Sequence, residues 1–275
     1  MKSSNPIFSR RGFDRPAGAG SAGDHLVNPY AGVGGSSLLK ESPTVRMTTA
    51  MTMDDVIVRT AATLGTVVLT AALSWVLLPV DQDALGRSYG IAVTAAVTAF
   101  VLSLVQTFKR TPSPALILGY AAFEGVFLGV ISDTTSTYVA PGVIVQAVLG
   151  TFAVFTGVLI AYRMRWIRVT RRFFGFVLAS ATGFLLLTAV DLLLAALGAG
   201  NGLGLGSGGL GVAFGVAGVL LGACFLALDF KQVEDAIAYG APREESWLAA
   251  FGLTATLVWI YLEALRVLTI LRDDS

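Results

Sequence analysis

Apolar residues occur along the chain in seven long blocks that short polar joints separate. The blocks cover about residues 56–79, 88–108, 113–132, 142–162, 173–198, 209–230 and 247–271. Each block is long enough, at about 20 residues or more, to cross a hydrocarbon core of about 30 Å. The joints carry turn-forming residues, such as Pro141-Gly142 and Gly240-Ala241-Pro242. The pattern therefore predicts an all-α membrane protein whose residues 54–275 form seven transmembrane helices, with antiparallel chain neighbours.

Residues 1–53 precede the apolar blocks and are rich in Gly, Ser, Ala and Pro. A segment of this composition cannot bury enough apolar surface to order itself, so we predict a disordered N-terminal tail. The only histidine, His25, lies in this tail. We expect its side chain to be solvated.

Composition agrees with a bilayer as the solvent. Hydrophobic residues make up 55% of the chain and charged residues 13%, whereas an ordinary soluble domain is roughly a quarter charged. The formal net charge of +1 implies no general attraction to nucleic acid. The single cysteine, Cys224, lies within an apolar block and cannot form an intrachain disulfide, so we expect it to be a small packing residue.

The basic residues of the joints predict the orientation, because cytoplasmic loops hold an excess of Lys and Arg. The tail holds six of them, and the joints near 109–112, 163–172 and 231–246 hold two, five and two, whereas the intervening joints hold Arg87 alone. We therefore predict a cytoplasmic N-terminus in a bacterial plasma membrane. Seven spans would place the C-terminus outside, and Arg266 and Arg272 mildly oppose this, so a re-entrant last segment is an alternative.

The residue types exclude most catalytic constellations. A lone histidine in the tail excludes a Ser-His-Asp triad and a His-rich zinc site, and one cysteine excludes a Cys-based site. We therefore expect neither an enzyme nor a bound cofactor. What remains is acid within apolar blocks, namely Glu124, Asp229 and Glu263. An ionised acid facing lipid costs at least a few kcal/mol, so such residues face the bundle interior or water and mark ion pathways.

Each acid also has a structural interpretation. Glu124 could be protonated and make an interhelical hydrogen bond. Asp229 lies close enough to a joint to act at a helix end, and Glu263 could be neutralised by Arg266 three residues later. Asp191, in the fifth block, is expected near the outer interface and solvated.

Three further features of the sequence concern helix packing and the membrane surface. Glycines spaced by four, at Gly125/Gly129 and at Gly211/Gly215, favour close helix packing. Residues 230–237 have the pattern of an amphipathic extension of the sixth helix, with Glu234 and Asp235 facing water. Arg59, early in the first block, is expected to extend to the lipid headgroups.

Several motifs together resemble one family. They are Phe108-Lys109-Arg110, Glu124-Gly125-Val126-Phe127-Leu128-Gly129, Pro141-Gly142-Val143-Ile144, Leu228-Asp229-Phe230, and Leu257–Glu263 followed by Leu265-Arg266. With them the chain resembles the Bax inhibitor-1/YccA family over about residues 54–275. Residues 3–8 are similar to those of actinobacterial members.

The resemblance implies a fold in which six helices surround a central C-terminal helix, and a pH-sensitive calcium leak. It also implies two aspartates on the sixth and seventh helices that share a proton, and a basic residue ending the second helix that engages the first aspartate. Asp229 matches the first aspartate and is a possible Ca²⁺ contact. Arg110 or Lys109 matches the basic partner. The second position falls at Thr256, which cannot ionise, so Glu124 or Glu263 is a candidate for the second acid.

These observations predict a passive cation conduit in the lipid bilayer, gated by protonation of intramembrane carboxyl groups. A non-conducting regulator that binds membrane proteases or stress-response partners is an alternative. A proton-coupled transporter is another, although the sequence contains no evident inverted repeat.

Overall fold

The computed structural model describes residues 50–80, 85–139, 141–198, 200 and 202–273. The predicted tail up to residue 49, with His25, lies outside these residues.

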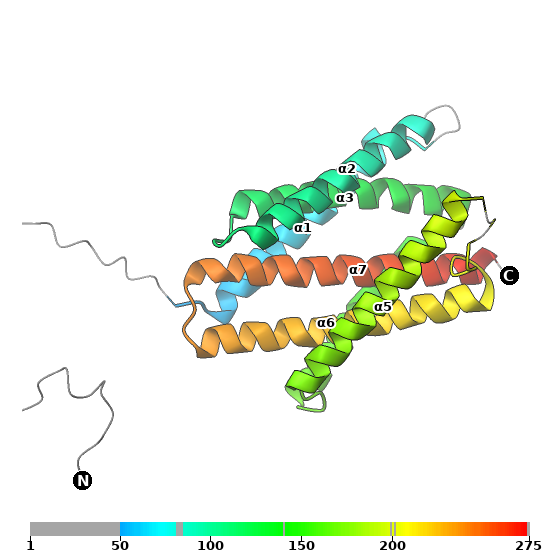
Figure 1. Ribbon diagram of the computed structural model, residues 1–275. Coiled ribbons are helices and arrows are strands. Elements are labelled where there is room, and N and C mark those ends of the chain that lie inside the picture. The colour runs from blue at the N-terminus through cyan, green and yellow to red at the C-terminus, as the bar shows by residue number, and fades with distance from the viewer. Residues whose placement is uncertain (1–49, 81–84, 140, 199, 201, 274–275) are drawn as a thin grey trace, which may run out of the picture. The chain divides into compact units, whose positions relative to one another are not determined.

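Seven α-helices account for most of the described chain (Figure 1). They are α1 (Met53–Leu77), α2 (Leu85–Phe108), α3 (Pro114–Tyr138), α4 (Val143–Arg163), α5 (Arg171–Ala196), α6 (Gly208–Ala238) and α7 (Ser246–Asp273), with a 3₁₀ turn η1 (Arg243–Glu245) before α7. All seven are long and apolar enough to cross a membrane. The described ranges contain no β-strand apart from one isolated bridge between Ala50 and Pro242. The prediction of an all-α protein with seven membrane helices is confirmed.

Local sequence signals explain where several helices begin. Thr52 and Asp55 form a capping box at the start of α1, and Thr170 accepts a hydrogen bond from the backbone N–H of Phe173 at the start of α5. Pro114 occupies the first turn of α3, where its missing N–H costs nothing. Two helices end well beyond the predicted blocks. Helix α3 continues to Tyr138, and α6 continues to Ala238, which confirms the predicted extension of the sixth helix.

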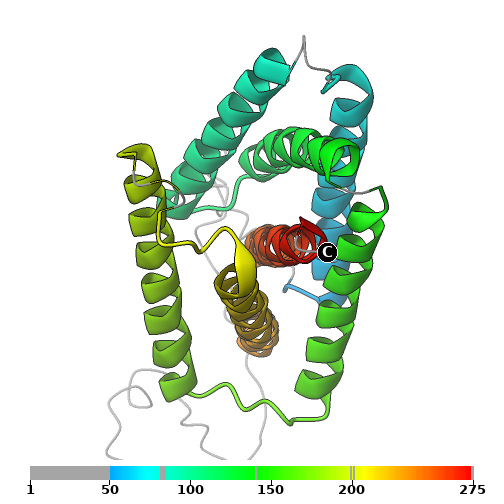
Figure 2. The same cartoon turned by 90° about the vertical axis from the view of Figure 1, so that its right-hand side faces the viewer.

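Helix α7 packs against α1, α3, α4 and α6, and Figure 2 shows it nearly end-on between them. The main partner of α2 is α3, and that of α5 is α6. A ring of six helices around a central α7 stays a prediction. Helix α7 is continuous over 28 residues, or about 42 Å, so it can span the membrane.

Glycines allow the closest helix contacts, as predicted. A Cβ at Gly125 would overlap the backbone of α1 at Val67, and one at Gly129 would lie 2.7 Å from Cβ of Ser74. The glycines of α6 at positions 211, 215, 218 and 222 all face side chains of α7. Because these positions lack side chains, the backbones of each pair approach closely. Cys224 packs beside the core cluster formed by Val177, Ala181, Phe184 and Leu221, as expected for a packing residue.

Candidate functional site

Asp229 lies on α6 and faces α7. The hydroxyl of Thr256 donates a hydrogen bond of 2.6 Å to Oδ2 of Asp229. A Cβ at Gly252, one turn earlier on α7, would lie 3.4 Å from Oδ1. Asp229 precedes the last residue of α6, Ala238, by nine positions, or about 14 Å, so it lies within the helix and not at its end. The carboxyl group is therefore held in the α6–α7 interface.

Glu263 occupies the same interface from the opposite helix. Its side chain is 12% exposed, and a Cβ at Gly218 of α6 would lie 2.7 Å from its Cδ. Oε2 is buried and accepts no hydrogen bond within the described part of the chain. Its nearest cation is Nη1 of Arg266, at 3.7 Å. The predicted ion pair is therefore present but long, and it leaves the buried oxygen without a hydrogen-bond donor.

The two carboxyl groups are separated along one interface. Glu263 follows Thr256, the partner of Asp229, by seven positions on α7, which corresponds to about 10 Å. Between them, Nε1 of Trp259 donates a hydrogen bond of 3.1 Å to the backbone oxygen of Gly218. Polar groups thus recur along the α6–α7 contact.

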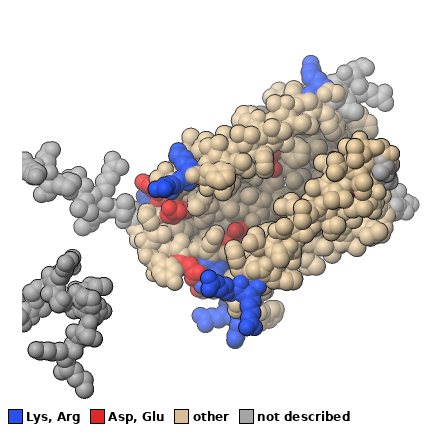
Figure 3. Space-filling model, viewed as in Figure 1, with Lys and Arg blue, Asp and Glu red and all other residues tan. Residues whose placement is uncertain are grey.

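Glu124 lies on α3, on the side of that helix whose neighbouring residues contact α7. Its neighbour one turn earlier on α3, Tyr120, packs edge-on against Phe251 of α7, with ring centroids 5.0 Å apart. Two turns later, Ser132 and Tyr261 share a hydrogen bond of 2.7 Å. Glu124 is partly buried between these contacts and makes no hydrogen bond or ion pair with any residue that the structure describes. Figure 3 shows acidic side chains within a hollow on the viewed face of the bundle, away from its ends.

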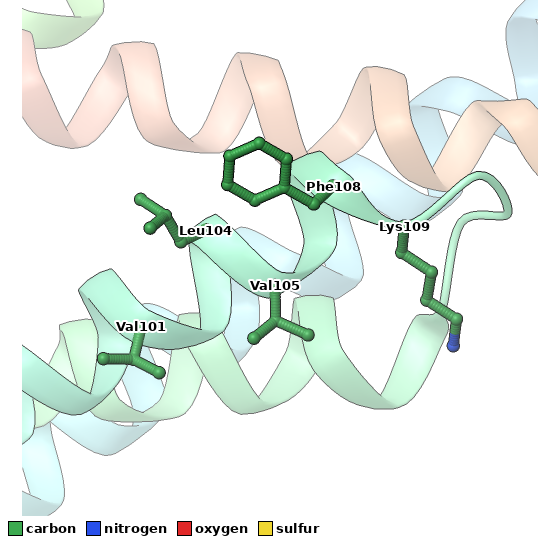
Figure 4. A pocket seen from close by; sticks show the side chains of 5 residues that line it. All are labelled: Val101, Leu104, Val105, Phe108 and Lys109. Carbon is green, nitrogen blue, oxygen red and sulfur yellow. The ribbon is translucent and has the colours of Figure 1, made fainter.

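The predicted basic partners lie at the end of α2. Lys109 and Arg110 are both exposed, and within the described ranges neither forms an ion pair with a carboxylate. An ion pair between one of them and Asp229 stays a prediction. Lys109 borders an open apolar pocket along α2, where Figure 4 shows its nitrogen directed away from the four apolar side chains, which are Val101, Leu104, Val105 and Phe108.

One buried acid lies outside the predicted apolar blocks. Asp133, on α3, is 9% exposed, and the hydroxyl of Thr137 lies 3.5 Å from its Oδ1. The predicted third block ended at residue 132, which placed Asp133 in a joint. The polar residues Ser132–Tyr138 concealed the continuation of the helix. A polar run can remain helical in a membrane because a Thr hydroxyl can donate a hydrogen bond to the backbone carbonyl oxygen one turn earlier. Thr134 and Thr135 do so.

Two polar residues outside the candidate site bond to backbone groups of the joints between helices. Nη1 of Arg59 donates to the backbone oxygen of Arg243 at 2.6 Å, and its guanidinium lies 5.1 Å from the centroid of the Trp247 ring. Oδ1 of Asp191 accepts a hydrogen bond of 2.7 Å from the backbone N–H of Leu203. Each residue thus links a helix to a joint. That Arg59 reaches the lipid headgroups and that Asp191 lies near the outer interface stay predictions.

The extension of α6 carries acids with local partners. Tyr162 of α4 donates a hydrogen bond to Glu234, and Lys231 pairs with Asp235 one turn later. Glu234 is exposed, as predicted, and Asp235 is intermediate in exposure.

The described residues contain no group of three or more His, Cys, Asp or Glu side chains that could hold a metal ion. Calcium takes six to eight oxygen ligands. Asp229 with the hydroxyl of Thr256 supplies three, so these two residues by themselves do not form a resident calcium site.

Seven membrane-length helices with carboxyl groups at their interfaces define a multi-pass α-helical membrane protein. A family model described as Bax inhibitor 1 like matches residues 5–273, nearly the whole chain. The protein belongs to the Bax inhibitor 1 like family. No match is found among curated proteins.

Proposed function

We propose that the protein is a passive, pH-sensitive cation conduit and that calcium is the ion it conducts. The observation that supports this most directly is the carboxyl group of Asp229, which the hydroxyl of Thr256 holds in the interface between α6 and α7. An acid placed at a helix interface inside a membrane bundle is costly, and such acids mark ion pathways. The choice of calcium rests on membership of the family and on the preference of Ca²⁺ for oxygen ligands.

The charge state of Asp229 is the proposed switch. An ionised carboxyl group can only accept hydrogen bonds, as it does from Thr256. A protonated carboxyl group also has an O–H donor and can donate a hydrogen bond to a different partner. A Cβ at Gly252 would lie 3.4 Å from Oδ1 of Asp229, so the carboxyl group lies close to α7 at this glycine. A change of charge at this point therefore changes the contact between the two helices, and with it the path for cations.

Two further acids supply negative charge along α7. Glu263 lies in the same interface as Asp229, about two turns further along α7. Glu124 lies on the side of α3 whose neighbouring residues contact α7. In our proposal these carboxyl groups attract cations, and Lys109 or Arg110 pairs with Asp229 in a closed state.

We place the protein in a bacterial plasma membrane with its N-terminus in the cytoplasm, as the distribution of Lys and Arg favours. In this role it needs no catalytic group and no resident cofactor.

The test is calcium flux into vesicles that contain the purified protein, measured at several pH values. Asp229→Asn, Glu124→Gln and Glu263→Gln are compared with the parent, and Asp54→Asn is the control, because Asp54 is an exposed acid at the start of α1. We expect a changed flux or pH response in the three interior variants and none in the control. Unchanged flux in all three would contradict the proposal. A stoichiometric protein partner without flux would favour a regulator, and uphill transport under a pH gradient would favour a transporter.

A further inference from the structure

The joint between α4 and α5 concentrates positive charge. Five arginines lie within residues 163–172, here called the arginine loop, and this segment contains no acid. They are Arg163, Arg165, Arg168, Arg171 and Arg172. All five are exposed, and none forms an ion pair with a carboxylate that the structure describes. Figure 3 shows Lys and Arg side chains gathered at one end of the bundle.

The arginine loop has a defined backbone. The N–H groups of Arg165 and Trp166 donate hydrogen bonds of 3.0 and 2.9 Å to the backbone oxygens of Tyr162 and Ala161. The side chains of Ile167 and Val169 pack against the core cluster that includes Val233 of α6. Because the backbone is fixed, less conformational entropy is lost when the guanidinium groups bind a ligand.

Neither local acids nor helix stability accounts for these charges. The nearby acids on the extension of α6 have other partners, since Glu234 accepts a hydrogen bond from Tyr162 and Asp235 pairs with Lys231. Arg171 and Arg172 occupy the first turn of α5, where a positive charge is unfavourable to the helix dipole. The positive charge is therefore available for an external anion.

The position and the neighbouring side chains indicate which anion. The arginine loop joins the ends of two membrane-length helices, so it lies at the level of the lipid headgroups. Trp166 is 72% exposed and Met164 is 54% exposed within the same segment. Tryptophan is enriched at membrane interfaces, and the planar guanidinium group binds phosphate oxygens in pairs. We propose that the arginine loop binds the headgroup phosphates of anionic phospholipids.

The test measures binding of phosphatidylglycerol to the purified full-length protein in a neutral detergent, with phosphatidylcholine and inorganic phosphate as separate arms. The double variant Arg165→Gln/Arg168→Gln is compared with the parent. Arg87→Gln is the matched control, because Arg87 is an exposed arginine at the start of α2, at the other end of the bundle. The helical circular dichroism signal and the elution volume show whether each variant keeps its fold, and the single variant Arg168→Gln replaces the double variant if that one unfolds.

We expect the parent and Arg87→Gln to bind phosphatidylglycerol with similar dissociation constants. The double variant should bind it roughly 30-fold more weakly, because each arginine near an anionic surface contributes about 1 kcal/mol, or about a fivefold factor in affinity. Equal binding by the parent and the folded loop variant would overturn the proposal. The proposal would also be overturned if the parent bound phosphatidylcholine as tightly as phosphatidylglycerol. The same holds if it bound inorganic phosphate as tightly at the same concentration, because binding would then not depend on the anionic lipid.

Discussion

The hydroxyl of Thr256 donates a hydrogen bond of 2.6 Å to Oδ2 of Asp229 and so joins α7 to α6. Thr256 is the position at which the family resemblance implies a second aspartate. Where the resemblance implies two acids, this interface has one carboxyl group and one hydroxyl group that join the same two helices.

Removal of this donor should weaken the α6–α7 interface. In Thr256→Val, Asp229 keeps its partly buried carboxyl group but loses its donor, which should destabilise the protein by about 1–3 kcal/mol. Thermal unfolding in detergent measures the effect. Thr94→Val is the control, because the hydroxyl of Thr94 bonds only to a carbonyl oxygen of its own helix. Equal unfolding midpoints for the two variants would show that the interhelical bond adds no stability.

A second acid at position 256 should change the pH response. In Thr256→Asp, two carboxyl groups would lie within hydrogen-bonding distance and could not both ionise cheaply, so one would retain its proton to higher pH. The midpoint of the curve of calcium flux against pH should therefore move to higher pH than in the parent. Thr256→Asn, which has a similar size and no charge, should not produce this shift. A midpoint equal to that of the parent would argue that position 256 does not govern the pH response.

The glycines at the α1–α3 contact should be intolerant of a methyl group. In Gly125→Ala, the added Cβ would overlap the backbone oxygen of Val67, so the helices must separate, and we expect destabilisation of about 1–3 kcal/mol. Gly150→Ala on α4 is the control, since no heavy atom lies within 4 Å of its added Cβ. Thermal unfolding of both variants checks this. A loss of the same size in both would point to a general effect of the substitution and not to helix packing.

The side chain of Arg59 should stabilise the turn before α7. It bonds to the backbone oxygen of Arg243 and lies over the ring of Trp247. In Arg59→Gln these two contacts are lost, so the amides of residues 241–247 should exchange with deuterium faster, while those in the middle of α3 should not change. Unaltered exchange at the turn would indicate that Asp55, which pairs with Arg243 at 2.7 Å, holds the turn by itself.

The seven helices could be predicted from the sequence because each apolar block had the length of a membrane span. The end of α3 was predicted short because hydropathy falls there while the helix continues, and this concealed the buried acid Asp133, whereas the amphipathic pattern revealed the continuation of α6. The spacing of Gly125 and Gly129 predicted a packing face. It could not name α1 as the partner, because a repeat along one helix contains no information about the helix that it contacts.

The candidate site was predictable in part. Hydropathy alone selected Asp229, Glu124 and Glu263, since an acid is conspicuous among apolar residues. The hydrogen bond between Asp229 and Thr256 was not predicted. The resemblance placed Thr256 only at the position of the second acid, and the two residues are 27 positions apart on different helices. The contacts of Arg59 and Asp191 with backbone groups could not be predicted. Almost every residue has a backbone carbonyl oxygen and N–H group, so the sequence does not distinguish one such partner from another.

The most direct test of the conduit is the pH profile of calcium flux through vesicles that contain Asp229→Asn, recorded beside the parent and Asp54→Asn. The parent and Asp54→Asn should respond to pH between about 5 and 8, where carboxyl groups in a bundle can titrate. Asp229→Asn should lose this response, since the asparagine amide cannot change its charge. A parent without calcium flux, or an Asp229→Asn profile identical to that of the parent, would contradict the proposed conduit.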